Sequence, residues 1–454
     1  MGAYTPHTPN EISQMLERIG VGSLEELLAV SPEIAPKAPL DVVPALPEYQ
    51  IERRMKALAA RNHADEYTSF LGAGAYRHYA PPAIAALAMR GEFLTAYTPY
   101  QAEVSQGYLQ AIYEWQSYIC LLTGMEIANA SVYDGATALA EGSIMAINAT
   151  GRTRLLLSRA VDPRYRAVLH TYCGGLDIEI DEIAVGADGR TDSASALAAI
   201  EAKTYAAVVL QSPNFFGVID ELHPQMRHAI ESSGTVPIAV VSEAISLGAL
   251  RPPAQWGAQI VVGEAQSFGV ALAYGGPYVG FIAATAEHMR RIPGRLVGRS
   301  LDNRGQEAFT LTLQAREQHI RREKATSNIC TNQAHCALIA TIYLALMGAS
   351  GLRDVAGLNL ERSRELATAV SGVPRVSLRF DAPFFNEIVV RVGNGAEVLA
   401  ALQKRGVLGG VDLGRFYPEY ADSILMTATE LTSTGDIAKL TAALREVVHV
   451  AALR

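Results

Sequence analysis

Short amphipathic stretches near the N-terminus are separated by proline-rich sequence. Asn10 and Ser23 each precede such a stretch, E-I-S-Q-M-L-E-R-I and L-E-E-L-L-A-V. Because Asn and Ser are favoured helix N-caps, the pattern predicts two short capped helices. The next segment, S-P-E-I-A-P-K-A-P-L, holds three prolines, which block a continuous helix. We therefore expect residues 1–90 to form a helical and extended arm rather than a self-sufficient domain.

From Arg154 onward, short apolar runs alternate with helical patterns. The runs are L-L-L-S-R, A-A-V-V-L-Q-S, P-I-A-V-V-S, Q-I-V-V-G and Y-V-G-F-I-A. Buried strands that alternate with helices are typical of a mostly parallel sheet wrapped by helices. The pattern predicts a large α/β domain over residues 91–335.

The pattern changes after Asn332, where long helices are expected. The strand-like runs I-V-V-R-V and S-I-L-M-T-A-T-E follow, with a helix from Glu397 to Arg405 between them and a terminal helix after Ser433. This indicates a smaller α+β domain over residues 336–454. The order of arm, large α/β domain and small domain resembles the aspartate-aminotransferase-like architecture, fold type I of the pyridoxal-phosphate-dependent transferases. A fold alone does not define a function.

Composition narrows the classes of function. The chain has 454 residues, 49% of them hydrophobic, and a net charge of −8, which argue against disorder and against a nucleic-acid partner. The four cysteines show no metal-binding spacing, so we expect reduced thiols and no metal site: Cys120, Cys173, Cys330 and Cys336. No apolar run of membrane-spanning length and no signal-like N-terminus are found, so we expect a cytoplasmic protein without a membrane partner.

Five segments resemble the N-terminal half of glycine decarboxylase P-proteins. They are F-L-G-A-G-A-Y-R-H-Y (Phe70 to Tyr79), A-Y-T-P-Y-Q-A-E-V-S-Q-G (Ala96 to Gly107), Y-D-G-A-T-A (Tyr133 to Ala138), F-G-V-A-L-A-Y-G-G-P (Phe268 to Pro277) and R-E-Q-H-I-R-R-E-K-A-T-S-N-I-C (Arg316 to Cys330). Five segments in the same order over nearly the whole chain make accidental similarity remote. The chain thus resembles the N-terminal-half-like, or alpha, subunit of the P-protein of the glycine cleavage system.

This resemblance implies an activity and partners. The complex would decarboxylate glycine on pyridoxal 5'-phosphate, release CO2 and transfer the aminomethyl group to the lipoyl arm of the H-protein. In bacteria with a divided enzyme, the chain would act only together with the second P-protein subunit, in a dimer of heterodimers.

The lysines indicate which of the two subunits this is. The chemistry needs a Schiff-base lysine just after a strand of the large domain. The chain has six lysines: Lys37, Lys56, Lys203, Lys324, Lys404 and Lys439. None of them follows the strand Gln259 to Gly263, where the resemblance places Gln266 at the Schiff-base position. An amide cannot form a Schiff base, so we expect no covalently bound cofactor on this chain and pyridoxal phosphate on the partner subunit.

A second departure supports this interpretation. The strand Pro237 to Val241 runs into Ser242 and Glu243, where the family should have an aspartate that pairs with the pyridinium nitrogen. The chain would then have no catalytic residue of its own and would complete the active site of its partner.

Two segments are candidates for that role. Thr326, in E-K-A-T-S-N, resembles the threonine by which cysteine-desulfurase-like relatives reach across the dimer to the cofactor phosphate, and Ser327 and Asn328 would fix the turn. The second segment places polar side chains around Pro99 and is either part of a site or interface or simple core: Tyr97, Thr98, Tyr100, Gln101 and Glu103.

Other interpretations remain open. Tyr133 to Ala138 is either a surviving phosphate loop or only a helix N-terminus, which is the simpler interpretation. The chain as a whole would alternatively be an independent aminotransferase-like enzyme that uses Lys324, or a docking module for the H-protein without any group near the chemistry.

Overall fold

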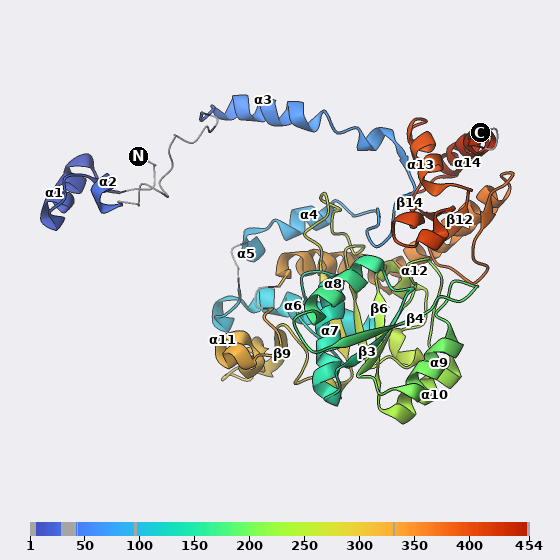
Figure 1. Ribbon diagram of the computed structural model, residues 1–454. Coiled ribbons are helices and arrows are strands. Elements are labelled where there is room, and N and C mark those ends of the chain that lie inside the picture. The colour runs from blue at the N-terminus through green and yellow to red at the C-terminus, as the bar shows by residue number, and fades with distance from the viewer. Residues whose placement is uncertain (1–5, 29–41, 43, 95–97, 330–331, 452–454) are drawn as a thin grey trace. The chain divides into compact units, whose positions relative to one another are not determined.

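The computed structural model describes residues 6–28, 42, 44–94, 98–329 and 332–451, which divide into two units, Met1–Ala64 and Asp65–Arg454 (Figure 1). The first unit holds the helices α1 (Pro9–Ile19), α2 (Leu24–Leu27) and α3 (Glu48–Ala59).

Local hydrogen bonds explain where the first two helices begin. Ser23 caps α2 as predicted, because its side chain accepts from the Glu26 N–H. The prediction for Asn10 was wrong, since α1 begins at Pro9, two residues before Glu11, and its cap is Thr8. The Thr8 hydroxyl accepts from the Glu11 N–H, and the Glu11 carboxylate accepts from the Thr8 N–H at 2.7 Å. Because these two hydrogen bonds form together, Thr8 and not Asn10 is the N-cap of the helix.

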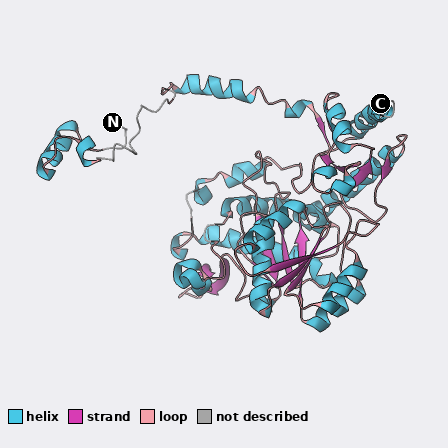
Figure 2. Ribbon diagram, in the orientation of Figure 1, coloured by secondary structure: helices cyan, strands magenta, loops and turns pink. Residues whose placement is uncertain are grey.

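A seven-stranded sheet forms the centre of the second unit (Figure 2). Its spatial order is β2 (Ile127–Ala128), β8 (Gly280–Ala284), β7 (Ile260–Glu264), β6 (Val236–Val241), β5 (Ala207–Gln211), β3 (Arg154–Ser158) and β4 (Glu179–Ile183). The last five are parallel to one another, and β8 is antiparallel to both of its neighbours. The predicted mostly parallel sheet is confirmed.

Alternate strand residues build a core on each face of the sheet. Val208 and Val261 pack in one cluster with α6 (Gln106–Thr123) and α12 (Ala334–Ser371). Their neighbours Val209 and Val262 pack in the other with α7 (Gly135–Thr150) and α8 (Pro163–Cys173). Because both faces are covered, the strands consist almost only of apolar residues. The helices α9 (Ser193–Ala202) and α10 (Pro224–Ser233) also join the first cluster.

A smaller antiparallel sheet follows in the chain. Its order is β11 (Ser377–Leu378), β12 (Glu387–Arg391), β15 (Ser423–Thr427) and β14 (Val411–Asp412). The helices α13 (Gly395–Gln403) and α14 (Thr434–Ala451) pack against it, close to the predicted positions. The N-terminal strand β1 (Thr68–Ser69) pairs with β13 (Val407–Leu408), which ties the start of this unit to its C-terminal part.

The remaining elements are short. They are α4 (Ala83–Ala88), α5 (Gly91–Leu94), α11 (Gln318–Arg321) and the hairpin of β9 (Leu296–Leu301) with β10 (Glu307–Thr312).

One described helix, α12, is long and apolar enough to cross a membrane by length and composition. It is interrupted at Gly348, whose backbone is not helical (φ 61°, ψ −176°). Its residues Ala340 and Tyr343 are fully or almost fully buried in the core of the large domain, and Leu366 is buried against the small sheet. α12 is therefore a core helix that connects the two sheets.

Candidate functional site

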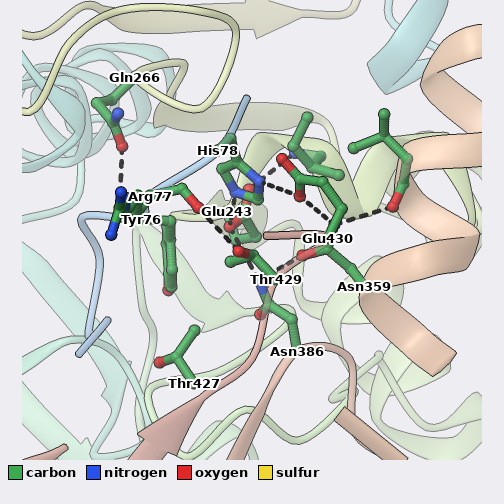
Figure 3. Close-up of polar contacts among 12 residues, drawn as sticks. Tyr76, Arg77, His78, Glu243, Gln266, Asn359, Asn386, Thr427, Thr429 and Glu430 are labelled. Atoms are coloured by element: carbon green, nitrogen blue, oxygen red, sulfur yellow. Dashed lines mark hydrogen bonds and ion pairs between the residues drawn. The ribbon is translucent and has the colours of Figure 1, made fainter. Parts of the chain in front are cut away.

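Gln266 lies in the loop after β7, at the carboxyl edge of the central sheet. Its Oε1 accepts from the Tyr76 N–H at 3.0 Å (Figure 3). Its Nε2 donates to the Val270 carbonyl at 2.8 Å. The side chain is only 3% exposed. Both ends of the amide are therefore used inside the protein, and the position offers no amine to a cofactor.

The neighbouring Glu264 bonds to the N-terminus of α7. Its Oε2 accepts from the Gly135 N–H, and its Oε1 accepts from the N–H groups of Gln266 and Val279, each at 3.0 Å. Asp134 caps the same helix by accepting from the Thr137 N–H at 2.7 Å. Burial raises the pKa of Glu264 to about 7, although these N–H groups act in the opposite direction.

The Gly135 position leaves no space beside this carboxyl. A Cβ at residue 135 would lie 2.1 Å from the Tyr165 hydroxyl, which is itself buried. The first N–H of α7 thus donates to Glu264, and the side chain of Tyr165 lies beside it. This geometry fits the simpler interpretation of Tyr133 to Ala138 as a helix N-terminus, and it does not fit a bound phosphate.

The end of β6 shows a similar internal pairing. The Ser242 hydroxyl accepts from Gln211, and the Glu243 carboxylate contacts Nε2 of His78 at 3.0 Å. Nδ1 of His78 contacts Glu430 at 2.8 Å, so the imidazole lies between two carboxylates (Figure 3). Burial opposes the charged imidazole, but the two carboxylates outweigh it and raise the pKa of His78 to about 10.

The carboxylates around His78 have further donors. Asn386 donates to Glu243 at 3.1 Å, while Asn359 and the Tyr79 N–H donate to Glu430 at 2.9 and 2.7 Å. The network joins the segment Phe70 to Tyr79, the end of β6, α12 and the loop after β15. Glu243 is thus paired with His78 inside the protein.

A second buried carboxyl anchors the same segment. Glu387 in β12 accepts from the Tyr76 hydroxyl at 2.9 Å and from the Ala73 N–H at 2.7 Å. Burial raises the pKa of Glu387 to about 7. A Cβ at Gly72 would lie 1.9 Å from the Thr427 hydroxyl oxygen, so only glycine fits there. The first motif therefore joins the large domain to the small sheet.

Thr326, Ser327 and Asn328 line a pocket of about 530 Å³ between α7, α8 and their own loop. Tyr133 and Tyr172 are partly exposed at the same pocket. The Ser327 hydroxyl accepts from the Ile329 N–H at 3.0 Å, which stabilises the turn that follows Thr326. Thr326 itself is partly exposed.

The segment around Pro99 contacts another predicted motif. Arg295 donates to the Tyr100 hydroxyl at 3.1 Å and lies 5.1 Å from the centre of its ring. The same arginine is 3.7 Å from Glu317, in the segment Arg316 to Cys330. The Thr98 hydroxyl oxygen is buried and has no hydrogen-bond partner within the described residues.

The other predicted residues of this segment are less informative. Gln101 and Glu103 are exposed at the short turn Ala102–Val104. Tyr97 lies outside the described residues, so its position stays a prediction. Arg295 connects Tyr100 with Glu317 but not with Thr326, and among the described residues no hydrogen bond links Tyr100 or Thr326 to Gln266.

Sequence reasoning missed His78, Glu264 and Arg295. His78 is within the first quoted motif, and Glu264 is two residues before Gln266. Their partners are distant in sequence, which hid the interactions. In the part of the chain that the structure describes, no group of three His, Cys, Asp or Glu residues could hold a metal ion.

The fold, with the candidate site at the carboxyl edge of the central sheet, defines a class of protein. This class is the proteins with a pyridoxal-phosphate-dependent transferase-like fold. The sphingosine-1-phosphate lyase of Burkholderia pseudomallei K96243 aligns with a TM-score of 0.65 at 13% identity over 92% of this chain and 95% of that chain. A NifS-like protein from Rickettsia africae aligns with a TM-score of 0.61 at 10% identity over 84% of this chain and 99% of that chain. At such identities these two structures show the fold alone.

Closer similarity defines the family. Residues 2–444 match the family model "Glycine cleavage system P-protein". A crystal structure of glycine decarboxylase (P-protein) of the glycine cleavage system, in inhibitor-bound form, aligns with a TM-score of 0.87 at 43% identity over 98% of this chain and 100% of that chain. The chain belongs to the glycine cleavage system P-protein family, which confirms the resemblance found in the five motifs.

Relatives also identify the subunit. The probable glycine dehydrogenase (decarboxylating) subunit 1 of Solibacter usitatus is 47% identical over 444 residues, 97% of this chain and 96% of that protein. The subunit 1 protein of Carboxydothermus hydrogenoformans is 46% identical over 439 residues, 96% of this chain and 98% of that protein. Within the family, the chain is therefore a subunit 1, which implies a partner subunit.

Proposed function

We propose that this chain is the subunit of glycine decarboxylase that carries no covalently bound cofactor, and that it completes the active site of subunit 2. The observation that supports this most strongly is that the amide of Gln266, at the position where the resemblance would put the Schiff-base lysine, is held by Tyr76 and Val270. Glu264 at the N-terminus of α7 and His78 beside Glu243 add two more groups that replace contacts to a cofactor. The residues present do not fit pyridoxal phosphate.

The complex would perform the reaction that the family implies. Glycine is decarboxylated on pyridoxal phosphate held by subunit 2, CO2 is released, and the aminomethyl group passes to the lipoyl arm of the H-protein. In this proposal the complex is a dimer of heterodimers in the cytoplasm, and this chain is inactive alone. Unpaired thiols at Cys120, Cys173 and Cys336 support a reducing compartment.

This chain would contribute groups to the partner's site from two segments. Thr326 would donate to the cofactor phosphate of subunit 2, with Ser327 holding the turn. Thr98, Tyr100, Gln101 and Glu103 would face the partner's substrate channel, together with Tyr97. The exposed pocket at Thr326 and the buried, unpartnered hydroxyl of Thr98 support a ligand or a second chain at these positions.

The division into an arm (residues 1–90), a large domain (91–335) and a small domain (336–454) remains part of the proposal. The core clusters support it, because the residues that pack on the central sheet and those that pack on the small sheet form separate groups.

Cofactor analysis tests the proposal. The chain alone and its complex with subunit 2 would be purified, reduced with borohydride and digested for peptide mapping. We expect phosphopyridoxyl-lysine only in peptides of subunit 2, and glycine-dependent CO2 exchange only in the complex. A phosphopyridoxyl-lysine peptide from this chain, in particular one with Lys324, would refute the proposal and favour an independent enzyme.

A further inference from the structure

The pocket at Thr326 contains a buried acid that the proposed function does not use. Glu141 of α7 lines this pocket, it is 5% exposed, and its Oε2 has no hydrogen-bond partner. Buried polar atoms are nearly always paired in native proteins. The Oε2 atom therefore points to a donor that the described residues of this chain do not supply.

The rest of the lining supplies no positive charge to this acid. It includes tyrosine, threonine, serine and asparagine side chains, but no lysine, arginine or histidine among the described residues. A buried carboxylate without a cation is costly, and burial raises the pKa of Glu141 to about 7. A cation beside Glu141 would favour the carboxylate form.

The same lining does not fit anions or zwitterions. A phosphate inside the pocket would lie beside Glu141 with no cation to balance it. A contact of Thr326 with the cofactor phosphate of subunit 2 would therefore have to be made outside the pocket. Glycine carries a carboxylate beside its ammonium group, and no lining residue would pair with that carboxylate. The pocket thus fits a cation that has no negative group.

The aromatic and aliphatic residues of the pocket fit a cation on an apolar stem. Tyr133 and Tyr172 are partly exposed there, and the face of a tyrosine ring attracts an ammonium or guanidinium group. Ile144, Leu176 and Ile329 offer apolar contacts to methylene groups. A lysine or arginine side chain combines both features.

We propose that the pocket around Glu141 receives a lysine or arginine side chain of subunit 2, whose charged group pairs with Oε2. A subunit 1 implies a partner subunit, and the loop at residues 325–329 lines the pocket on the side that the proposed function assigns to that partner. This role rests on the proposed function for the identity of the partner, but it does not depend on the cofactor. The buried charge would select the correct partner surface, because an apolar or acidic group would leave Glu141 unpaired.

Glu141→Gln tests the charge of the pocket. Glutamine keeps the shape but cannot balance a buried cation. We expect the Kd for assembly with subunit 2, measured by analytical ultracentrifugation, to rise about thirtyfold. Equal Kd values for the native and the Glu141→Gln chains would overturn the proposal.

Ser143→Ala is the matched control. Ser143 lies on the same helix, is fully buried and has an unpaired hydroxyl, but it does not line this pocket. The Ser143→Ala chain should assemble with the native Kd. A loss equal to that of Glu141→Gln would show that any change in α7 weakens assembly, and would overturn the proposal.

A double-mutant cycle identifies the partner group. Each lysine and arginine of subunit 2 would be replaced by methionine in turn. One replacement should weaken assembly with the native chain about as much as Glu141→Gln does, and should cause little further loss with the Glu141→Gln chain. A scan in which no replacement shows this coupling would contradict a cationic partner residue.

Binding of n-butylammonium distinguishes a side chain of subunit 2 from a free amine, and it needs no variant that could misfold. In ligand-observed NMR, the native chain alone should bind this probe, whereas the complex should not, because the pocket is filled. Equal binding to the chain and to the complex would show that the pocket takes a free amine, and the role of subunit 2 would be wrong.

These measurements are independent of those that test the proposed function. If assembly depends on Glu141 while a phosphopyridoxyl-lysine peptide comes from this chain, the pocket is right and the proposed function is wrong. If the cofactor is found only on subunit 2 and Glu141→Gln assembles normally, only the role of the pocket is wrong.

Discussion

Two residues, one at the end of β7 and one in the loop that follows, carry the chemical difference that we propose for this chain. In the proposed function Gln266 puts an amide where the cofactor-bearing subunit has an amine, and Glu264 gives the N-terminus of α7 an acceptor of its own. The amide at Gln266 could be noticed in the sequence, because the chain has few lysines and none lies in the loop directly after β7. The role of Glu264 could not be predicted, because its donors are the backbone N–H groups of Gly135 and Val279, which no side-chain pattern reveals.

Thr326→Val tests the contact that we propose across the interface. Valine keeps the shape of threonine and removes the donor. A hydroxyl bonded to a phosphate dianion contributes about 1.5–3 kcal/mol, so the complex should bind pyridoxal phosphate roughly ten- to a hundredfold more weakly. Equilibrium titration of the apo-complex measures this. Thr368→Val, at an exposed position of α12, is the control and should change nothing.

His78→Gln tests the buried charge between Glu243 and Glu430. Glutamine leaves two buried carboxylates without a cation, which should cost about 3–5 kcal/mol of stability near neutral pH. Thermal unfolding of the complex measures the loss. His170→Gln, at an exposed position of α8, is the control and should leave the unfolding temperature nearly unchanged.

The pH dependence of the same variant has a defined sign. The pKa of His78 is raised from 6.5 to about 10 on folding, so the folded state holds its proton more tightly than the unfolded state. This stabilisation is fully present below pH 6.5 and is lost as the pH rises through about 10. The native complex should therefore lose stability between pH 6.5 and 10 more steeply than the His78→Gln complex. Parallel stability curves would show that His78 is neutral in the folded protein.

At the scale of elements, the positions of the strands were easier to predict than the directions in which they pair. The apolar runs after Arg154 became β3, β5, β6, β7 and β8, because a sheet covered on both faces requires continuous apolar strands. Periodicity alone did not reveal that β8 runs antiparallel to β7. The interruption of α12 was also missed, because glycine is tolerated inside helices and its backbone angles follow from packing at both ends.

Two glycines of α12 provide an element-scale prediction. A Cβ would meet no atom within 4 Å at either Gly357 or Gly348, so only the backbone distinguishes them. Gly357→Ala in an exposed helical position should stabilise the protein by about 0.5–1 kcal/mol. Gly348→Ala should destabilise it by about 1–3 kcal/mol, because φ 61° with ψ −176° is nearly restricted to glycine. Chemical denaturation of both variants measures the difference, and equal shifts would argue against the interruption.

At the scale of the whole molecule, helices of the N-terminal unit have apolar faces that this unit does not cover by itself. In α3, Ile51, Met55 and Leu58 are 48%, 58% and 48% exposed and share one face at helical spacing. No residue of α1, α2 or α3 is buried. Helices this short gain most of their stability from packing of an apolar face, so we expect these faces to be covered in the assembly with subunit 2.

Replacing the apolar face of α3 tests this expectation. Glutamine at Ile51, Met55 and Leu58 together should weaken assembly with subunit 2 at least tenfold, since each buried aliphatic side chain contributes about 1.5–3 kcal/mol. Analytical ultracentrifugation of the mixed subunits measures the affinity. The matched control puts glutamine at Glu52, Arg53 and Lys56 on the polar side of the same helix, which should leave assembly intact. If both triple variants assemble like the native chain, α3 does not contribute to the interface, and the arm would have to be assigned a role outside the complex.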